Sequence, residues 1–215
     1  MKLTTLLILL VTLTANLFAQ SETRSTIGSY YIGLGYRGYS DDVSDFDSLV
    51  IDSNFPVHPN FDLGVGGYIG SISVLNLDLL SYGVDVDAKI HNKFDLGSAT
   101  IDPYFSLGIG LSAIESYNWY YVGSDYYYNY YQTVSSTSLL VPYNLSIGSE
   151  FTFGNFFSLV PAIGVSGLLN EDVDNTFQYG IQANFLFTDF FSVGVSFVGD
   201  DESGKQFSIL GRYHL

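Results

Sequence analysis

The sequence predicts an all-β fold, a transmembrane antiparallel up-and-down β-barrel, and three observations support this. Apolar residues alternate with small or polar ones along most of the chain, which is the period of a β-strand. Only 13% of the residues are charged, against about 25% in an ordinary soluble domain. After the first segment no apolar run reaches the length of about 20 residues that a membrane helix needs, so the apolar residues are dispersed as in a membrane barrel.

The first residues predict a secretory signal peptide. A positive Lys2 precedes the short apolar run 6–13, and Ala19 is a small residue suited to the position before a cleavage site. We therefore expect residues 1–19 to be removed during export through the periplasm and residues 20–215 to form one barrel domain. The chain contains no Cys, which excludes a lipoprotein anchor and a structural disulfide.

The alternation also indicates which kind of β-protein this is. In the segment 104–113, one face carries Phe105, Leu107, Ile109, Leu111 and Ala113, and the other carries Tyr104, Ser106, Gly108, Gly110 and Ser112. In a soluble sandwich the second face would meet water and be rich in Lys, Glu and Thr. Here and in the other strands it is mainly Gly, Ser, Asn and Gln, which fit the inside of a narrow barrel.

Ten strands follow from this pattern. Their expected ranges are 27–39, 46–55, 61–71, 81–91, 99–114, 138–152, 156–168, 177–187, 190–199 and 205–215. Four short turns rich in aromatic residues join alternate pairs of them, at 58–64, 91–97, 153–159 and 187–193. Asn, Asp and Gly favour turns, and aromatic rings favour a membrane interface. We expect these turns and both termini at the periplasmic side, with the longer connections 40–45, 72–80, 115–137, 169–176 and 200–204 outside.

Two elements fit the pattern less well. The segment 46–55 has only Leu49, Ile51 and Phe55 as its apolar set, and eight strands is the alternative if this segment is a loop. Pro161 lies inside a predicted strand, where it cannot donate a ladder hydrogen bond. We therefore expect a bulge or a missing hydrogen bond near Pro161.

Taken together, the signal peptide, the alternating strands and the closing run resemble the small outer-membrane β-barrels of Gram-negative bacteria, the outer-membrane protein A-like and opacity-type porin-like families. The closing run is Phe207, Ile209, Gly211, Tyr213 and Leu215. The resemblance implies an outer-membrane location, contact with lipid and lipopolysaccharide, and insertion by the barrel-assembly machinery. Members usually end in an aromatic residue and usually have eight strands, whereas this chain ends in Leu215.

Several charged residues fall on the inward, polar phase of the predicted strands. They are Arg37, Asp85, Asp87, Lys89, Glu150 and Arg212. Paired charges inside a narrow barrel can fill it or line a small ion path. The favoured interpretation is a filled polar core, because buried charges must be paired.

The longest expected external loop is unusually rich in tyrosine and contains the only Trp of the chain. Its candidate binding residues are Tyr117, Trp119, Tyr120, Tyr121, Tyr126, Tyr127, Tyr128, Tyr130 and Tyr131. Tyr and Trp give large, rigid contact surfaces with a polar tip, which favours adhesion or ligand recognition. The alternative, which we favour, is that the neighbouring strands continue past the membrane as a β-hairpin with cross-strand Tyr contacts.

The remaining features argue against several functional classes. A net charge of -15 excludes nucleic acid as a partner. His58 and His91 fall in predicted periplasmic turns and His214 is next to last, so no Ser/His/Asp arrangement forms at the external end and we expect no enzyme. The acidic loops lack the spacing of a calcium-binding loop, and we expect no metal or cofactor. The sequence thus favours a monomeric structural or surface-exposed outer-membrane barrel with a mostly filled lumen. The alternatives are a small diffusion channel and an adhesin.

Overall fold

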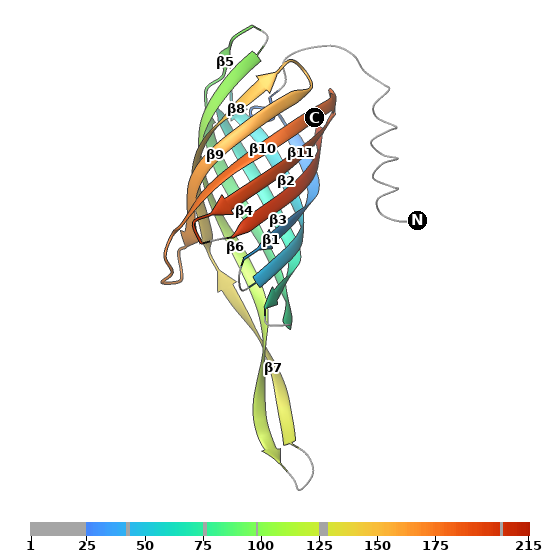
Figure 1. The fold of residues 1–215 in the computed structure, drawn as a ribbon, viewed down its shortest axis with the longest axis vertical. Helices are drawn as coiled ribbons and strands as arrows, with labels where there is room; N and C mark the ends of the chain where they lie inside the picture. The colour runs from blue at the N-terminus through green and yellow to red at the C-terminus, as the bar shows by residue number, and fades with distance from the viewer. Residues whose placement is uncertain (1–24, 42–43, 75–76, 98, 125–128, 203) are drawn as a thin grey trace, which may run out of the picture.

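The computed structural model describes residues 25–41, 44–74, 77–97, 99–124, 129–202 and 204–215, which form a tall barrel with a long hairpin at one end (Figure 1). Twelve strands of these residues belong to one sheet. They are β1 (Tyr31–Ser40), β2 (Ser44–His58), β3 (Phe61–Val74), β4 (Leu77–His91), β5 (Phe94–Asp95), β6 (Ala99–Ser124), β7 (Asn129–Leu140), β8 (Pro142–Phe153), β9 (Phe157–Leu168), β10 (Thr176–Thr188), β11 (Phe191–Asp200) and β12 (Lys205–His214). Among the described residues, no helix is long and apolar enough to cross a membrane.

Ten of these strands close into a ring of antiparallel neighbours. The ring runs β4, β3, β2, β1, β12, β11, β10, β9, β8 and β6, and pairing between β4 and β6 closes it. The two other strands, β5 and β7, both pair with β6. The prediction of ten strands is therefore confirmed, and the doubtful segment 46–55 lies within β2, which is paired along its whole length.

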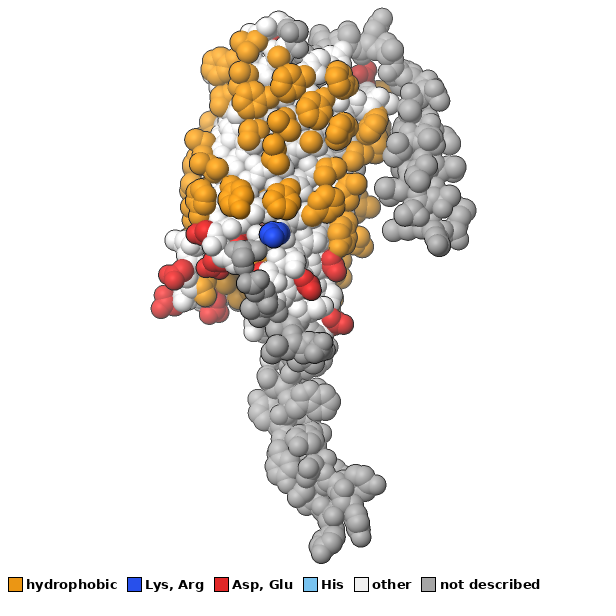
Figure 2. All heavy atoms as spheres, in the orientation of Figure 1, with side chains coloured by type: hydrophobic (Ala, Val, Ile, Leu, Met, Phe, Trp, Pro, Cys, Tyr) orange, Lys and Arg blue, Asp and Glu red, His pale blue; other side chains and the backbone are white. Residues whose placement is uncertain are grey.

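The outer face of the barrel is apolar. Alternate side chains such as Leu34 on β1 (68% exposed) and Val84 on β4 (60% exposed) point away from the barrel. Figure 2 shows the apolar side chains as a broad band across the face in view, with charged side chains beyond its edge on the hairpin side. Because the ring is closed, the wall has no free strand edge, which is the condition for surrounding such a surface with lipid.

The two ends of the barrel differ in their connections. At one end, called the short-turn end below, β2–β3, β8–β9 and β10–β11 are joined by very short turns, and the described chain ends there at Leu215 (Figure 1). At the opposite, long-loop end, β6 continues to Ser124 and pairs with β7 beyond the wall. The interval 115–137, expected as a loop, is therefore largely a paired hairpin, which agrees with the alternative of continued strands.

The first predicted strand begins too early. We expected it at residue 27, but β1 begins at Tyr31. Gly28 has a φ of 74°, a left-handed conformation that no strand residue adopts. Residues 25–29 therefore turn away from the wall, and their position decides the character of the lumen.

Pro161 interrupts one ladder without shifting it. The register between β8 and β9 is the same on both sides of the interruption, at Gly148↔Ala162 and at Phe151↔Leu159. The intervening residues of the two strands, including Pro161, are not paired with each other, whereas Pro161 stays paired with Ile181 of β10. The structure thus has the missing pairing that the sequence predicts and no bulge, because the absent N–H of proline affects only the β8 side.

Candidate functional site

Residues 25–28, called the N-terminal segment below, lie in the lumen at the short-turn end, where Ser25, Thr26 and Ile27 are buried. The main anchor of this segment is the carboxylate of Glu150 on β8, which is 0% exposed. Oε1 of Glu150 accepts hydrogen bonds from the backbone N–H of Thr26 (3.1 Å) and from Oγ1 of Thr26 (3.0 Å). Oε2 accepts from the backbone N–H of Ile27 (3.0 Å) and from Oγ of Ser25. A carboxylate can be buried here because the N-terminal segment saturates it with donors.

A second carboxylate, Asp62 on β3, holds the end of the N-terminal segment. Its Oδ2 accepts a hydrogen bond from the backbone N–H of Gly28 at 2.8 Å and another from Nδ2 of Asn54 at 2.9 Å. A Cβ at position 28 would lie 3.4 Å from Cε1 of His91, and the positive φ already disfavours any other residue. Glycine at this position therefore lets the backbone approach Asp62 closely.

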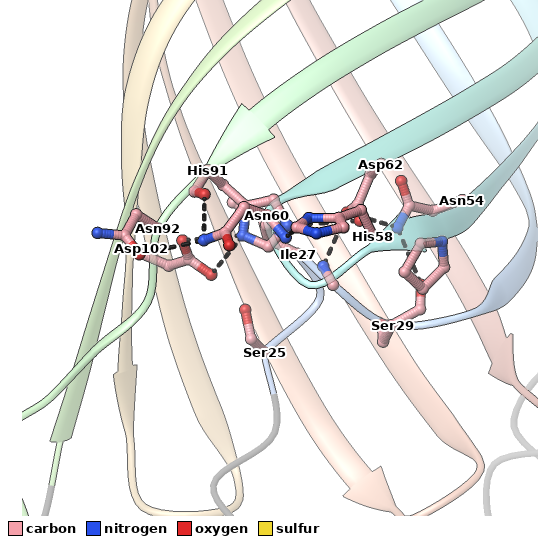
Figure 3. A network of polar contacts seen from close by, with 12 residues as sticks. Ser25, Ile27, Ser29, Asn54, His58, Asn60, Asp62, His91, Asn92 and Asp102 are labelled. Atoms are coloured by element: carbon pink, nitrogen blue, oxygen red, sulfur yellow. Dashed lines mark hydrogen bonds and ion pairs between the residues drawn. The ribbon is translucent and has the colours of Figure 1, made fainter.

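His91, the last residue of β4, lies between two buried carboxylates (Figure 3). Its Nδ1 is 3.1 Å from Oδ1 of Asp102, and its Nε2 faces Oδ1 of Asp62 at 3.4 Å. Sequence reasoning placed His91 in a predicted periplasmic turn, whereas it is the last residue of β4 and its side chain is buried inside the rim of the barrel. The ring thus connects Asp62, which holds the N-terminal segment, to Asp102 on β6.

A chain of hydrogen bonds runs from Glu150 through side chains of β9, β10 and β12. Ser158 on β9 donates to Glu150 at 2.5 Å, and Nδ2 of Asn184 on β10 donates to Oγ of Ser158 at 3.0 Å. Nη1 of Arg212 on β12 then donates to Oδ1 of Asn184 at 2.9 Å, and its guanidinium lies 5.2 Å from the centre of the Tyr31 ring. Glu150 is thereby saturated with donors, whereas Arg212 is held through Nη1 and the Tyr31 ring while its Nε stays buried without a hydrogen-bond partner.

Two cavities lie in the lumen beyond the N-terminal segment. The smaller, of about 210 Å³, has Thr26 and Ile27 in its lining. The larger, of about 350 Å³, extends along the barrel past Ser106 and Ser196. Both are bordered by one set of side chains, Asp87, Lys89, Tyr104, Val160 and Gln182. The ammonium of Lys89 lies 5.3 Å from the centre of the Tyr104 ring, so these two residues lie together in the lining that the cavities share.

Glycines on the inner face keep the cavities open. Asp85 on β4 is paired with Gly66 on β3, and a Cβ on Gly66 would stand 2.7 Å from Oδ2 of Asp85. Asp87 lies in the same way against Gly64. The two carboxylates therefore lie along the wall instead of projecting across the lumen.

The structure places the predicted lumen charges at two levels. Glu150 and Arg212 belong to the buried network near the N-terminal segment, whereas Asp85, Asp87 and Lys89 border the cavities. Arg37 lies close enough to Asp85 for its charge to act on that carboxyl.

Sequence reasoning missed other residues of the site. They are the N-terminal segment itself, Asn54, Asp62, His91, Asp102, Ser158 and Asn184. The signal was present, because Asp62, Asp102 and Asn184 fall on the same inward phase as the charges that were chosen.

The tyrosine-rich stretch lies at the far end of the molecule. The backbone of Tyr117, Trp119, Tyr120, Tyr121, Tyr130 and Tyr131 belongs to the β6–β7 hairpin. Tyr126, Tyr127 and Tyr128 lie outside the described residues, as does the predicted signal peptide. The hairpin is thus separated from the closed end of the lumen by the whole length of the barrel (Figure 1).

No protein-family model and no curated protein matches this sequence. Among solved structures, the translocator domain of autotransporter NalP from Neisseria meningitidis is 10% identical, with a TM-score of 0.52 over 99% of this chain and 95% of that one. An outer-membrane channel from Pseudomonas putida F1 is 11% identical, with a TM-score of 0.47 over 93% and 100%. Ail, the attachment invasion locus protein of Yersinia pestis, is 10% identical, with a TM-score of 0.33 over 86% and 95%. The likeness to the translocator domain and the closed ring of ten described strands show that this chain has the outer-membrane β-barrel fold.

Proposed function

We propose that this protein is a surface-exposed barrel of the bacterial outer membrane, whose lumen is closed on the periplasmic side by its own N-terminal segment. The observation that carries the proposal is the combination of an apolar outer band with a lumen closed by buried hydrogen bonds to Glu150 and Asp62. The first feature requires lipid, and the second argues against an open pore.

The outer band supports membrane insertion on energetic grounds. Leucine, isoleucine, valine and aromatic side chains that are about half exposed on every strand would be costly in water, at roughly 25 cal/mol per Å² of apolar surface. In lipid this cost disappears, and the closed ladder leaves few backbone groups without a partner.

The unequal ends support an orientation. Short turns at the periplasmic side and longer loops outside are the usual arrangement of such barrels. With this orientation the N-terminal segment faces the periplasm and the β6–β7 hairpin extends from the cell surface. The hairpin is then the part of the chain that meets the medium.

Membrane fractionation combined with a heat-modifiable gel shift tests the proposal. We expect the protein in the outer-membrane fraction, with an unboiled band that migrates differently from the boiled one. External protease should cleave within the hairpin and leave the gel-shifting barrel intact. A soluble protein without a gel shift would refute membrane insertion, and cleavage of the hairpin only from the periplasmic side would refute the orientation.

A small diffusion channel is the second candidate, favoured by the two adjoining lumen cavities. The wild-type protein would then give stepwise conductance in a planar bilayer. The closed periplasmic end predicts instead that insertions of the wild-type protein are silent.

A further inference from the structure

The N-terminal segment forms part of the lining of the smaller cavity. Thr26 and Ile27 border this cavity, and the same cavity adjoins the larger one at Lys89 and Tyr104. Without the segment, the smaller cavity would open toward the short-turn end. The segment therefore occupies the exit that a continuous water path through the barrel would need at this end.

The segment is not part of the wall. Within the described chain, residues 25–29 join no β-ladder, and β1 begins only at Tyr31. The segment is attached through hydrogen bonds to the side chains of Glu150 and Asp62. Tyr30, at its base, is fixed to the end of the barrel, because its carbonyl oxygen accepts a hydrogen bond from the backbone N–H of Leu215 at 3.0 Å. The segment can thus leave its seat without breaking a strand pairing.

Glu150 and Asp62 would tolerate withdrawal of the N-terminal segment, because water can replace the N–H and O–H donors that they would lose. Glu150 would keep the hydrogen bond from Ser158, and Asp62 would keep the one from Asn54. Both carboxylates would then face water-filled space connected to the smaller cavity, where their charges are hydrated and not buried without a partner. Withdrawal of the segment therefore replaces its hydrogen bonds to the two carboxylates with hydrogen bonds from water. Neither charge is left buried without a partner.

The charges along the opened path would favour cations. The carboxylates are Asp52, Asp62, Asp85, Asp87 and Glu150. The cationic groups are fewer, and two of them are engaged: Lys89 lies over Tyr104, and Arg212 is held by Asn184 and Tyr31. Rings of carboxylates in a narrow pore attract cations and repel anions.

From these observations we propose that the N-terminal segment is a gate and that its withdrawal turns the barrel into a narrow channel for small cations. The inference rests on the proposed membrane insertion, and it adds an activity that the closed barrel lacks. The gate is closed by hydrogen bonds to Glu150 and Asp62, and the passage behind it is selective through Asp85 and Asp87.

The first test removes the donors of the gate. The double variant Thr26→Pro/Ile27→Pro deletes both backbone N–H groups and the threonine hydroxyl that bind Glu150, and it breaks no ladder hydrogen bond. Each hydrogen bond to a charged group that is lost should shift the closed-to-open ratio about tenfold. We expect stepwise conductance in a planar bilayer in potassium chloride, with a reversal potential under a salt gradient on the potassium side. Val173→Pro, in an exposed loop, is the matched control and should remain silent.

The second test locks the gate. Oγ1 of Thr26 and Nδ2 of Asn184 are 3.5 Å apart, so these two side chains face each other, and the pair Thr26→Cys/Asn184→Cys is chosen for oxidation to a disulfide in a chain that has no other Cys. The oxidised protein should be silent, and the same sample should conduct about tenfold more often after reduction, since the reduced segment has lost the Thr26 hydroxyl bond. The single variant Thr26→Cys should not respond to the reductant.

The outcomes separate the two proposals. Variants that insert and shift on a gel, yet stay silent in every state, would overturn the gate and leave the outer-membrane barrel standing. Failure of the wild-type protein to insert at all would overturn the proposed function. Conductance with a preference for chloride would overturn the cation channel. Asp85→Asn/Asp87→Asn in the double-proline background should reduce the preference for potassium, and an unchanged preference would refute the role of these carboxylates.

Discussion

Gly148 on β8 lies directly against the ring of Tyr104, its partner on β6, because a Cβ at position 148 would stand 2.7 Å from both Cζ and Oη of that ring. The same position is 2.7 Å from the backbone oxygen of Pro161. Gly108 and Asn144 form a similar pair further along the same two strands. Inward glycines in this barrel are the places where a long side chain of the next strand is accommodated.

Gly148→Ala should therefore destabilise the barrel. The new methyl group meets a backbone oxygen and an aromatic ring, neither of which can move freely, so we expect a loss of about 1–3 kcal/mol. The gel-shift midpoint in a urea titration measures this loss. At Gly64→Ala the three nearest atoms belong to the Asp87 carboxylate, which can rotate away, so this substitution should cost less, and Gly211→Ala, with its nearest neighbour at 3.6 Å, should be neutral. An equal effect of the three substitutions would contradict the steric explanation.

His91→Leu should destabilise the short-turn end by about 3–5 kcal/mol, because it leaves the buried carboxylate of Asp102 without its partner. Adding Asp102→Asn removes the unpaired charge and should restore part of the stability, which a double-mutant cycle of urea midpoints measures. His58→Leu is the control, since His58 is exposed, and it should change stability by less than about 0.5 kcal/mol. Simple additivity of His91→Leu and Asp102→Asn would show that the two residues do not interact.

Pro161→Val should close the gap in the ladder between β8 and β9. Valine supplies the N–H that proline lacks and suits an outward position in a strand. We expect a gain of about 0.5–1.5 kcal/mol. Amide exchange at Ser149 and Glu150 should slow, while exchange at Ile163, already paired on both sides, stays the same. Lower stability would mean that the gap is needed to seat Glu150.

Shortening the β6–β7 hairpin should leave the barrel intact. Tyr117 and Ser135 are paired, so residues 118–134 can be replaced by an Asn-Gly turn without changing the register. Beyond Ile114, β6 no longer pairs with β4, and the described residues of the removed part pair β6 with β7. The gel shift and the urea midpoint should be unchanged. Any attachment of cells to surfaces that depends on the tyrosines should disappear, and undiminished attachment would exclude the hairpin as an adhesin.

The wall of the barrel was predictable from sequence because its physics is local. Alternation fixes which side chains face lipid, and a one-residue slip would reverse every one of them. Even β2 could be found from Leu49 and Ile51, since both its neighbours supply complementary partners. The turns were equally accessible, because Asn60 or Asp189 beside an aromatic residue favours a tight reversal.

The closed end was not predictable because its contacts join distant parts of the chain. Ile27 falls on the inward phase of β1, the opposite phase from the lipid-facing Ile32 and Leu34, so the alternation of apolar residues did not define where the strand begins. Gly28 keeps the preceding residues out of the strand because its φ is positive, and the alternation of apolar residues does not reveal this. Glu150 offered a clue, since its cross-strand partners are Asp102 and a residue in the Pro161 gap, so no cation faces it and donors must come from elsewhere.

The position of the N-terminal segment has a consequence for the order of folding. Ile27 and Glu150 are 123 residues apart in sequence, and the seam between β1 and β12 joins the first strand to the last. Contacts of such high sequence separation form late and slowly. Because the wall encloses the segment on all sides once the seam is paired, the segment must enter before β12 meets β1 or thread in from the short-turn end afterwards. Weakening the bond between Ile27 and Glu150 would then alter the rate of assembly as well as the state of the finished barrel.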